Sequence, residues 1–239
     1  MRIQGTLGSC ASFASTYYQL TYMTAFQRGL DIGGDEDNTY KYSPKWSYNM
    51  LNDGANSGTT IVENFSLLEK HGAATWAEFP YDTDYLAWCM NTTAWRNALS
   101  VRTRPTQYSW HTETDAGLDV IKQLLVNGYV LTFGTYMYSW NFTTIEDDPS
   151  TPDDDAAVGK NICFWVSGTS GGHAMTIVGY NDAIWTDING NDTVDAGEKG
   201  ALRIANSWGP DWNPADGGFI WLAYDALKDP SAVESGPST

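Results

Sequence analysis

The sequence is poor in basic residues. Its 239 positions hold 13 lysines and arginines against 29 aspartates and glutamates, a formal net charge of -16. A surface with this charge repels phosphate backbones, so we expect no nucleic-acid partner, whereas a cation such as calcium is compatible with it. Long apolar runs are absent too. None approaches the roughly 18 residues of a membrane-spanning helix, so no membrane span is expected.

Cysteine is equally scarce. Cys10, Cys89 and Cys163 are too few for a disulfide scaffold, although one pair can form and leave the third free. If Cys10 is the reactive thiol, Cys89 and Cys163 are the only pair left. Since 42% of the residues are hydrophobic, a chain of this length can bury one large core, or two lobes that share one, without a disulfide or a metal ion.

Helical patterns dominate the first half of the chain. Apolar residues at steps of three and four predict a helix over residues 9–30, with Cys10 in its first turn and Gly29 as a stop. A capping-box spacing opens a second predicted helix over 60–72. A third helix is predicted over 115–128, by the same apolar spacing.

The second half has the pattern of β-strands. Short β-branched and aromatic runs predict four strands, over residues 130–133, 174–178, 201–205 and 218–224. Because strands and helices are segregated along the chain, the expected fold class is α+β.

The same segregation predicts how the chain is divided. We expect one domain over 1–228, with a helical lobe over about 1–104 and a β lobe over about 105–228, and a linker-like tail over 229–239. An upstream propeptide or a downstream domain is compatible with this division. Two acidic segments, over 33–37 and 146–155, are interpreted as solvated loops.

The segment around Cys10 indicates a nucleophile. A thiol at a helix N-terminus is stabilised as a thiolate by unpaired backbone N–H groups and by the helix dipole, so we expect its pKa to be lowered. Taken alone, Cys10 can equally be a small buried hydrophobic residue. A nucleophile also needs a base, and the chain offers three histidines.

His173 is the strongest candidate for the base. It stands at the start of an apolar strand pattern, a rigid position from which a side chain can face a cleft. His71 precedes the helix-ending Gly72, where an imidazolium interacts favourably with the helix dipole. His111 stands next to Trp110 and has no catalytic context. The pattern therefore favours His173 over the other two.

Asn206 completes a set of three residue types. It ends another apolar run, and its side-chain oxygen can accept a hydrogen bond from the imidazole of His173 and so fix the tautomer. Trp208 is placed to shield this hydrogen bond from water. Cysteine, histidine and asparagine together supply a nucleophile, a base and an orienting group, although each alone is more simply structural.

Three separated motifs give the chain a resemblance to the papain family of cysteine peptidases. They stand in the family's order and span roughly residues 4–224: QGTLGSC at 4–10, GGHAMTIVGY at 171–180, and NSWG at 206–209 followed by GGFI at 217–220. The resemblance implies a papain-like two-lobe fold, with a helical N-terminal lobe and a β-barrel-like C-terminal lobe. It also implies peptidase activity on protein or peptide substrates.

The resemblance assigns roles to residues of this chain. It implies that Cys10 is the nucleophile, His173 the base and later the acid, and Asn206 the orienting group. Gln4 would be an oxyanion-hole donor beside the Cys10 backbone N–H. The implied reaction is acyl transfer, in which the Cys10 thiolate, paired with imidazolium His173, attacks a peptide carbonyl. The expected substrate-binding residues are Gly58, Gly172 and Trp208.

The sequence departs from the family pattern at positions that do no chemistry. Leu7 and Ala55 stand where many relatives carry two cysteines that bond to each other, and Ala11 stands where relatives carry a tryptophan. The motifs are also farther apart than in the papain pattern, which implies insertions between them. Catalysis is still expected.

One insertion, between His173 and Asn206, has the spacing of an EF-hand calcium loop. Over residues 187–198, oxygen-bearing side chains stand at positions 1, 3, 5, 9 and 12. Position 6 is Asp192 in place of glycine, so we expect Asp192 in a left-handed conformation. A solvated acidic turn is the alternative. The predicted ligands of a structural Ca²⁺ are Asp187, Asn189, Asn191, Asp195, Glu198 and the Thr193 carbonyl.

Two other functions fit the same sequence. A catalytically silent, calcium-stabilised binding module on a papain-like scaffold keeps the fold without activity. An amidase or transpeptidase keeps the chemistry and changes the substrate. The acidic composition, the calcium-type loop and the small number of lysines favour an extracellular, secreted protein over a cytosolic one.

Overall fold

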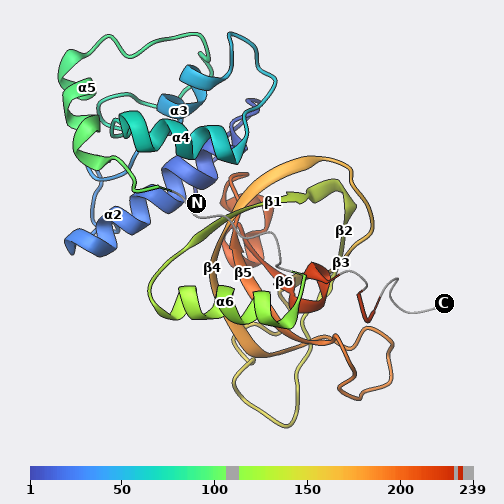
Figure 1. Cartoon of the computed structure of the whole chain (residues 1–239). Helices are drawn as coiled ribbons and strands as arrows, with labels where there is room; N and C mark the ends of the chain where they lie inside the picture. The colour runs from blue at the N-terminus through green and yellow to red at the C-terminus, as the bar shows by residue number, and fades with distance from the viewer. Residues whose placement is uncertain (106–112, 229–230, 234–239) are drawn as a thin grey trace.

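The computed structural model describes residues 1–105, 113–228 and 231–233. Helices occupy the first part of the chain and a sheet the second, as the α+β prediction requires (Figure 1). The helices are α1 (Cys10–Ser12), the π-helix η1 (Phe13–Leu20), α2 (Thr21–Arg28), α3 (Pro44–Leu51), α4 (Ile61–His71), α5 (Thr92–Ala98) and α6 (Asp115–Val126). The strands are β1 (Leu131–Tyr136), β2 (Trp140–Thr144), β3 (Asn161–Val166), β4 (Gly172–Trp185), β5 (Lys199–Ala205) and β6 (Phe219–Ala223).

The three predicted helices are confirmed. The first runs without interruption from α1 to α2 and ends at Gly29, whose φ of 63° gives the left-handed C-cap that glycine favours. Its middle is a π-helix instead of an α-helix, and in this wider turn the Ala14 carbonyl accepts a hydrogen bond from the Thr176 hydroxyl of β4. The predicted capping box of α4 is formed by Thr60 and Glu63.

The sheet is curled into a partly open barrel. Its strand order is β1-β4-β5-β6-β3-β2, with antiparallel neighbours except for the parallel pair β3 and β6. The edge strands β1 and β2 are separated in the chain only by the 3₁₀ turn η3 (Met137–Ser139). Because a three-residue connection cannot cross a flat sheet of this width, the sheet must bend until its two edges approach each other.

Two predicted features of the second half need correction. Strands β2 and β3 were not among the four predicted strands. The acidic segment between them is not simply solvated, because Asp148 and Asp154 are only 2% and 0% exposed. Of the predicted linker-like tail, the structure describes residues 231–233, whose Ala232 and Val233 N–H groups donate to the carboxylate of Asp225.

The N-terminal helices have one hydrophobic core, and the sheet shares a second core with α6. Trp46 and Leu68 are fully buried in the helical core, and Leu202 and Ile220 in the sheet core. Cys89 belongs to the first core and Cys163 to the second, and all three cysteines are free thiols, so the pair that the sequence left open does not form. No helix among the described residues is both long and apolar enough to cross a bilayer.

The two parts meet where the first helix lies against β4. Ala11 and Ala14 of the helix pack on Ala174 of the strand, and all three side chains are buried. Small side chains allow the helix and the strand to approach closely. This contact brings the first residue of the helix beside the first residues of β4, which are the two segments that the sequence marked as catalytic.

Candidate active site

Cys10 and His173 line the same cleft. This cleft has a volume of about 600 Å³. One wall is the start of the first helix, another is the segment from Leu51 to Glu63, and a third is the beginning of β4. The cleft therefore lies between the helical part and the sheet, with the candidate nucleophile at the start of the helix and the candidate base at the start of β4.

The position of Cys10 follows from the start of its helix. The helix begins at Cys10 itself, and Ser9 at the N-cap makes no side-chain capping bond, because its hydroxyl is hydrogen-bonded to the Tyr81 hydroxyl at 2.6 Å. The predicted position of Cys10 in the first turn is confirmed. A backbone hydrogen bond links the thiol to Ala174, the residue that follows His173.

Burial sets the charge of both groups at rest. Burial raises the pKa of the Cys10 thiol, although backbone hydrogen bonds with Ala174, Ala11 and Cys10 itself oppose this. Burial also lowers the pKa of His173, against the hydrogen bond with Asn206. The predicted lowering of the thiol pKa is therefore wrong, because desolvation outweighs the N–H groups of the helix terminus. Both shifts favour the thiol and the neutral imidazole over the ion pair.

His173 is held by its second nitrogen. Nε2 lies 2.8 Å from Oδ1 of Asn206, and the Asn206 side chain is buried, with an exposed fraction of 1%. If Nε2 donates the hydrogen to this amide oxygen, Nδ1 keeps its lone pair and can accept a proton. The indole of Trp208 lies over the imidazole, with ring centroids 4.7 Å apart. Trp208 therefore covers the imidazole of His173.

Gln4 lies behind the site and joins its two halves. Its backbone N–H donates to the Ser207 carbonyl at 2.7 Å, and its side-chain oxygen accepts from the Ser207 hydroxyl. One hydrogen of Nε2 goes to the Leu7 carbonyl at 2.9 Å. Because an amide nitrogen carries two hydrogens, the second Nε2 hydrogen remains to donate to an oxyanion. Gln4 is buried, however, and does not line the cleft in this structure.

The three expected substrate-binding residues lie at different places. Gly58 and Gly172 line the cleft, Gly58 on the wall formed by residues 51–63 and Gly172 on the wall that carries His173. Gly58 has a φ of 96°, a backbone conformation that glycine adopts without strain. Trp208 does not line the cleft and instead packs on His173. Its position indicates protection of the imidazole more than contact with a bound peptide.

Asn56 links the nucleophile loop to the Gly58 wall, a role that the sequence did not indicate. Its Oδ1 accepts the backbone N–H of Gly8 at 2.8 Å and the Tyr48 hydroxyl, and its Nδ2 donates to the Thr6 carbonyl at 3.1 Å. These bonds join the segments that contain Leu7 and Ala55. These hydrogen bonds hold the nucleophile loop against the Gly58 wall without a covalent link.

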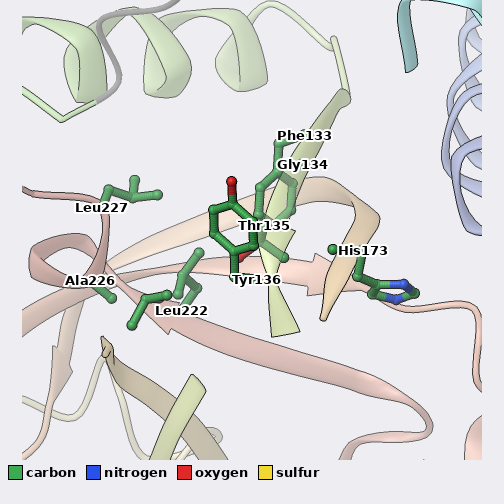
Figure 2. Close-up of a pocket in the computed structure, with 10 residues that line it drawn as sticks. Phe133, Gly134, Thr135, Tyr136, His173, Leu222, Ala226 and Leu227 are labelled. Carbon is green, nitrogen blue, oxygen red and sulfur yellow. The ribbon is translucent and has the colours of Figure 1, made fainter. Parts of the chain in front are cut away.

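A second hollow, of about 430 Å³, lies on the sheet side of His173 (Figure 2). In Figure 2 His173 stands at one edge of this hollow, and its imidazole points away from Leu222 and Leu227. Gly172 and His173 line both hollows, so the start of β4 forms a wall that the two share. The second hollow is largely apolar and is lined by Phe133, Gly134, Thr135, Tyr136, Val166, Gly172, His173, Leu222, Ala226 and Leu227.

The predicted calcium loop is a closed turn remote from the cleft lining. Asp192 has a φ of 56°, which confirms the expected left-handed conformation. The Asp187 carboxylate accepts the N–H groups of Gly190, Asn191 and Asp192. The buried Glu198 carboxylate accepts the N–H groups of two further residues of the loop, those of Ile188 at 2.9 Å and Asp195 at 3.0 Å.

The amide nitrogens of Asn189 and Asn191 both donate to Oδ2 of Asp195. All the predicted side-chain ligands therefore face one another or the loop backbone. The three carboxylates of Asp187, Asp195 and Glu198 are not gathered within 4.8 Å of one another in the described structure. The donor set consists only of oxygen atoms, which suits a hard cation such as calcium.

The fold is shared with solved structures of cysteine proteases. No protein-family model and no curated protein matches the chain. Xylellain, a cysteine protease from Xylella fastidiosa, matches with a TM-score of 0.61 and 20% identity, over 98% of this chain and 78% of xylellain. The bromelain protease of Ananas comosus, solved with the inhibitor E64, matches with a TM-score of 0.56 and 16% identity, over 99% and 87%.

A third structure has further sequence beyond the matched region. The ragweed pollen allergen Amb a 11, a cysteine protease in its proform, matches with a TM-score of 0.60 and 19% identity. The match covers 95% of this chain but only 57% of the proform. Identities near 20% show a common fold and leave activity to be argued from the site. The chain has the α+β fold of the papain-like cysteine proteases.

Proposed function

We propose that the chain is a cysteine peptidase that hydrolyses peptide bonds with Cys10, His173 and Asn206. The observation that carries the proposal is the shared cleft of Cys10 and His173, together with the 2.8 Å contact between His173 Nε2 and Asn206 Oδ1. That contact leaves Nδ1 as the nitrogen that can exchange a proton with the thiol. The fold shared with cysteine proteases supports the same class of activity.

The reaction begins from the neutral pair. As Sγ of Cys10 bonds to the substrate carbonyl carbon, its proton passes to Nδ1 of His173, and the Asn206 oxygen stabilises the resulting imidazolium. The imidazolium then protonates the leaving amine, and the C–N bond breaks to give the acyl-enzyme. His173 next takes a proton from water, whose oxygen attacks the thioester. The C–S bond then breaks, the imidazolium returns the proton to the Cys10 sulfur, and the carboxylic acid leaves.

The oxyanion needs donors near Cys10. The backbone N–H of Cys10, at the first position of its helix, is one such donor, and the second Nε2 hydrogen of Gln4 is the other. The hydrogen bonds of Gln4 with Ser207 and Leu7 fix its amide before substrate arrives. Preorganised donors lower the barrier because they do not have to reorient during the reaction.

We infer that substrates present an apolar side chain to the second hollow. Its lining includes Phe133, Val166 and Leu222, and it adjoins the Cys10 cleft at Gly172 and His173, which line both. Burial of an apolar side chain there contributes binding free energy, whereas a charged side chain would lose hydration. A peptide library should show cleavage favoured by leucine, valine or phenylalanine at one subsite; an equal preference for lysine or glutamate would contradict the inference.

Labelling with an epoxide thiol inactivator tests the active site directly. In the folded protein, peptide mass spectrometry should find the label on Cys10, because Cys89 and Cys163 are 8% and 0% exposed. In a His173→Ala variant the labelling of Cys10 should slow strongly, because no base accepts the proton. A Cys10→Ala variant should cleave no peptide. Equal, slow labelling of all three cysteines, or peptide cleavage by Cys10→Ala, would overturn the proposal in favour of a binding module.

We also propose that residues 187–198 bind a structural Ca²⁺. The ligands would be the side-chain oxygens of positions 1, 3, 5, 9 and 12 and one backbone carbonyl. The left-handed Asp192 and the backbone bonds of Asp187 and Glu198 support this, since they close the chain into a loop of the EF-hand length. A carboxylate offers about four lone-pair positions, so the Glu198 bonds leave acceptor capacity for a cation.

Calorimetric titration of the chelated protein with Ca²⁺ tests this site. An Asp187→Asn variant should lose one bound ion and part of the rise in melting temperature that calcium produces. Asp211→Asn, at an exposed position outside the loop, is the matched control and should behave like the wild type. Unchanged calcium binding by Asp187→Asn would rule the site out.

Secretion belongs to the same proposal and is supported by the acidic composition. Fractionation of the native source would test it, since recovery of the protein from the cell interior alone would contradict it.

A further inference from the structure

Three aspartates come together in the loop between β2 and β3. Asp147, Asp154 and Asp155 each contribute a carboxylate oxygen, and these oxygens lie within 4.8 Å of one another. Like charges at this separation repel each other by several tenths of a kcal/mol to a few kcal/mol, depending on how much water lies between them. A favourable interaction must therefore offset the repulsion between the three carboxylates.

Asp154 shows that this cluster is more than a solvated acidic surface. Its side chain has an exposed fraction of 0%, and its Oδ1 has no hydrogen-bond partner in the described structure. Its Oδ2 accepts only the Asp148 N–H, at 3.3 Å. A buried carboxylate oxygen without a partner is costly, because it loses the hydrogen bonds of water and gains nothing in return.

The nearby cations are engaged elsewhere. Lys199 pairs with Asp148 at 2.5 Å, and Lys160 pairs with Asp216 at 3.0 Å. Across residues 1–105, 113–228 and 231–233, no lysine or arginine forms an ion pair with any of the three clustered aspartates. The charge of the cluster is thus balanced by no basic side chain of the described chain, and a cation from solution is the simplest counter-charge.

We propose that Asp147, Asp154 and Asp155 bind a divalent metal ion, Ca²⁺, at a second site that is distinct from residues 187–198. Three carboxylates form an all-oxygen donor set, which selects hard cations over zinc or copper. The exposed Asp147 and Asp155 leave one side open to water, and Ca²⁺ accepts the irregular mixture of carboxylate and water ligands that such a site offers. The buried Asp154 oxygen is the fixed ligand.

The structure also indicates what the ion stabilises. The backbone N–H of Glu146 donates to the Trp185 carbonyl at 3.1 Å, and Asp148 is bonded to Lys199, the residue directly after Glu198. The cluster is therefore flanked on both sides by contacts with the segment that holds the proposed calcium loop. A cation at Asp154 fixes the β2–β3 loop against the ends of β4 and β5, so the two sites stabilise the same end of the sheet.

Calcium titration of the full chain, after chelation, tests this inference. The wild type should bind two Ca²⁺, and Asp154→Asn should lose one, with at least a tenfold weaker residual affinity at that site. Asp153→Asn, at an exposed aspartate of the same loop, is the matched control and should keep both ions. Asp147→Asn changes an exposed ligand without a buried group, so it separates loss of the ion from loss of the fold.

A second readout distinguishes ligation from general electrostatics. In EDTA, Asp154→Asn should melt at the same temperature as the wild type or higher, because the variant removes an unpaired buried charge. With calcium the order should reverse. Asp154→Asn and Asp147→Asn that both bind calcium with the stoichiometry and affinity of the wild type would overturn the second site.

The outcomes for the two calcium sites are separable. One ion in the wild type and none in Asp154→Asn would leave the second site standing and exclude residues 187–198. One ion in both proteins, lost in Asp187→Asn, would do the reverse. No binding by the wild type would exclude both sites, and none of these results bears on Cys10 chemistry.

Discussion

Nε2 of His173 lies 2.8 Å from Oδ1 of Asn206, although the two residues are 33 positions apart. Strand pairing brings them together. β4 and β5 are antiparallel, with Thr176 opposite Ala205, so the beginning of β4 lies beside the residues that follow β5. The 32 residues between His173 and Asn206 include the proposed calcium loop, so the chain leaves and returns at this pair. The sheet therefore fixes the imidazole independently of the helical part that carries Cys10.

The pH dependence of kcat/KM should reflect the two shifted pKa values. The His173 pKa is lowered from 6.5 and the Cys10 pKa is raised from 9.0, both chiefly by burial. The active form carries one exchangeable proton, shared between Cys10 and His173. As pH rises, activity therefore increases when the imidazolium of His173 deprotonates, and it decreases when the Cys10 thiol deprotonates. We expect a bell with its acid limb below pH 6.5 and its alkaline limb above pH 9.0. An acid limb above pH 7 would contradict this ordering.

Replacing Asn206 by alanine should both slow the reaction and shift its acid limb. The hydrogen bond with Asn206 raises the pKa of His173, so its loss should move the acid limb to lower pH. Loss of a hydrogen bond to an imidazolium costs about 1.5–3 kcal/mol, or about 10- to 100-fold in kcat/KM. Kinetics across pH with one peptide substrate would measure both effects. A lower rate with an acid limb at higher pH would show that Asn206 acts in another way.

Replacing Asn56 by alanine should loosen the wall that faces Cys10. The change removes bonds to Gly8, Thr6 and Tyr48, and we expect the free energy of unfolding to fall by about 1–3 kcal/mol, with kcat falling more than KM rises. Asn56→Asp is the matched control, because its carboxylate still accepts from Gly8 and Tyr48. Thermal unfolding and peptide kinetics would decide. Equal losses in both variants would mean that the Thr6 bond alone matters.

Gly8 should not tolerate a side chain. A Cβ built on Gly8 would lie 2.8 Å from the Gly58 nitrogen and 3.0 Å from its Cα, and neither backbone atom can move without displacing the cleft wall. Gly8→Ala should therefore lower both the melting temperature and kcat/KM. Gly172→Ala, in the same cleft, meets nothing within 4 Å and should leave the melting temperature unchanged. Similar melting temperatures for all three proteins would show that the two segments separate easily.

Local patterns in the sequence predicted most of the helices and strands around the site. The capping box at Thr60, the glycine stops at Gly29 and Gly72, and the apolar spacing all depend on neighbours within four residues, and the structure contains each of them. The sequence did not predict β2 and β3, because they are short strands on either side of a long acidic loop. Only their pairing with distant strands identifies them. The left-handed Asp192 was predictable, because aspartate is among the few residues that adopt this conformation readily.

The sequence by itself determined which residue types are present for the chemistry: a cysteine at a helix start, a histidine at a strand start and an asparagine at a strand end. Tertiary structure alone decided what surrounds them. Burial reversed the expected direction of the Cys10 pKa shift, since desolvation depends on the packing of the whole cleft and not on the helix terminus. Asn56 and Asp154 acquired their importance in the same way, because hydrogen-bond partners, and the lack of them, are set by segments that meet only when the chain is folded.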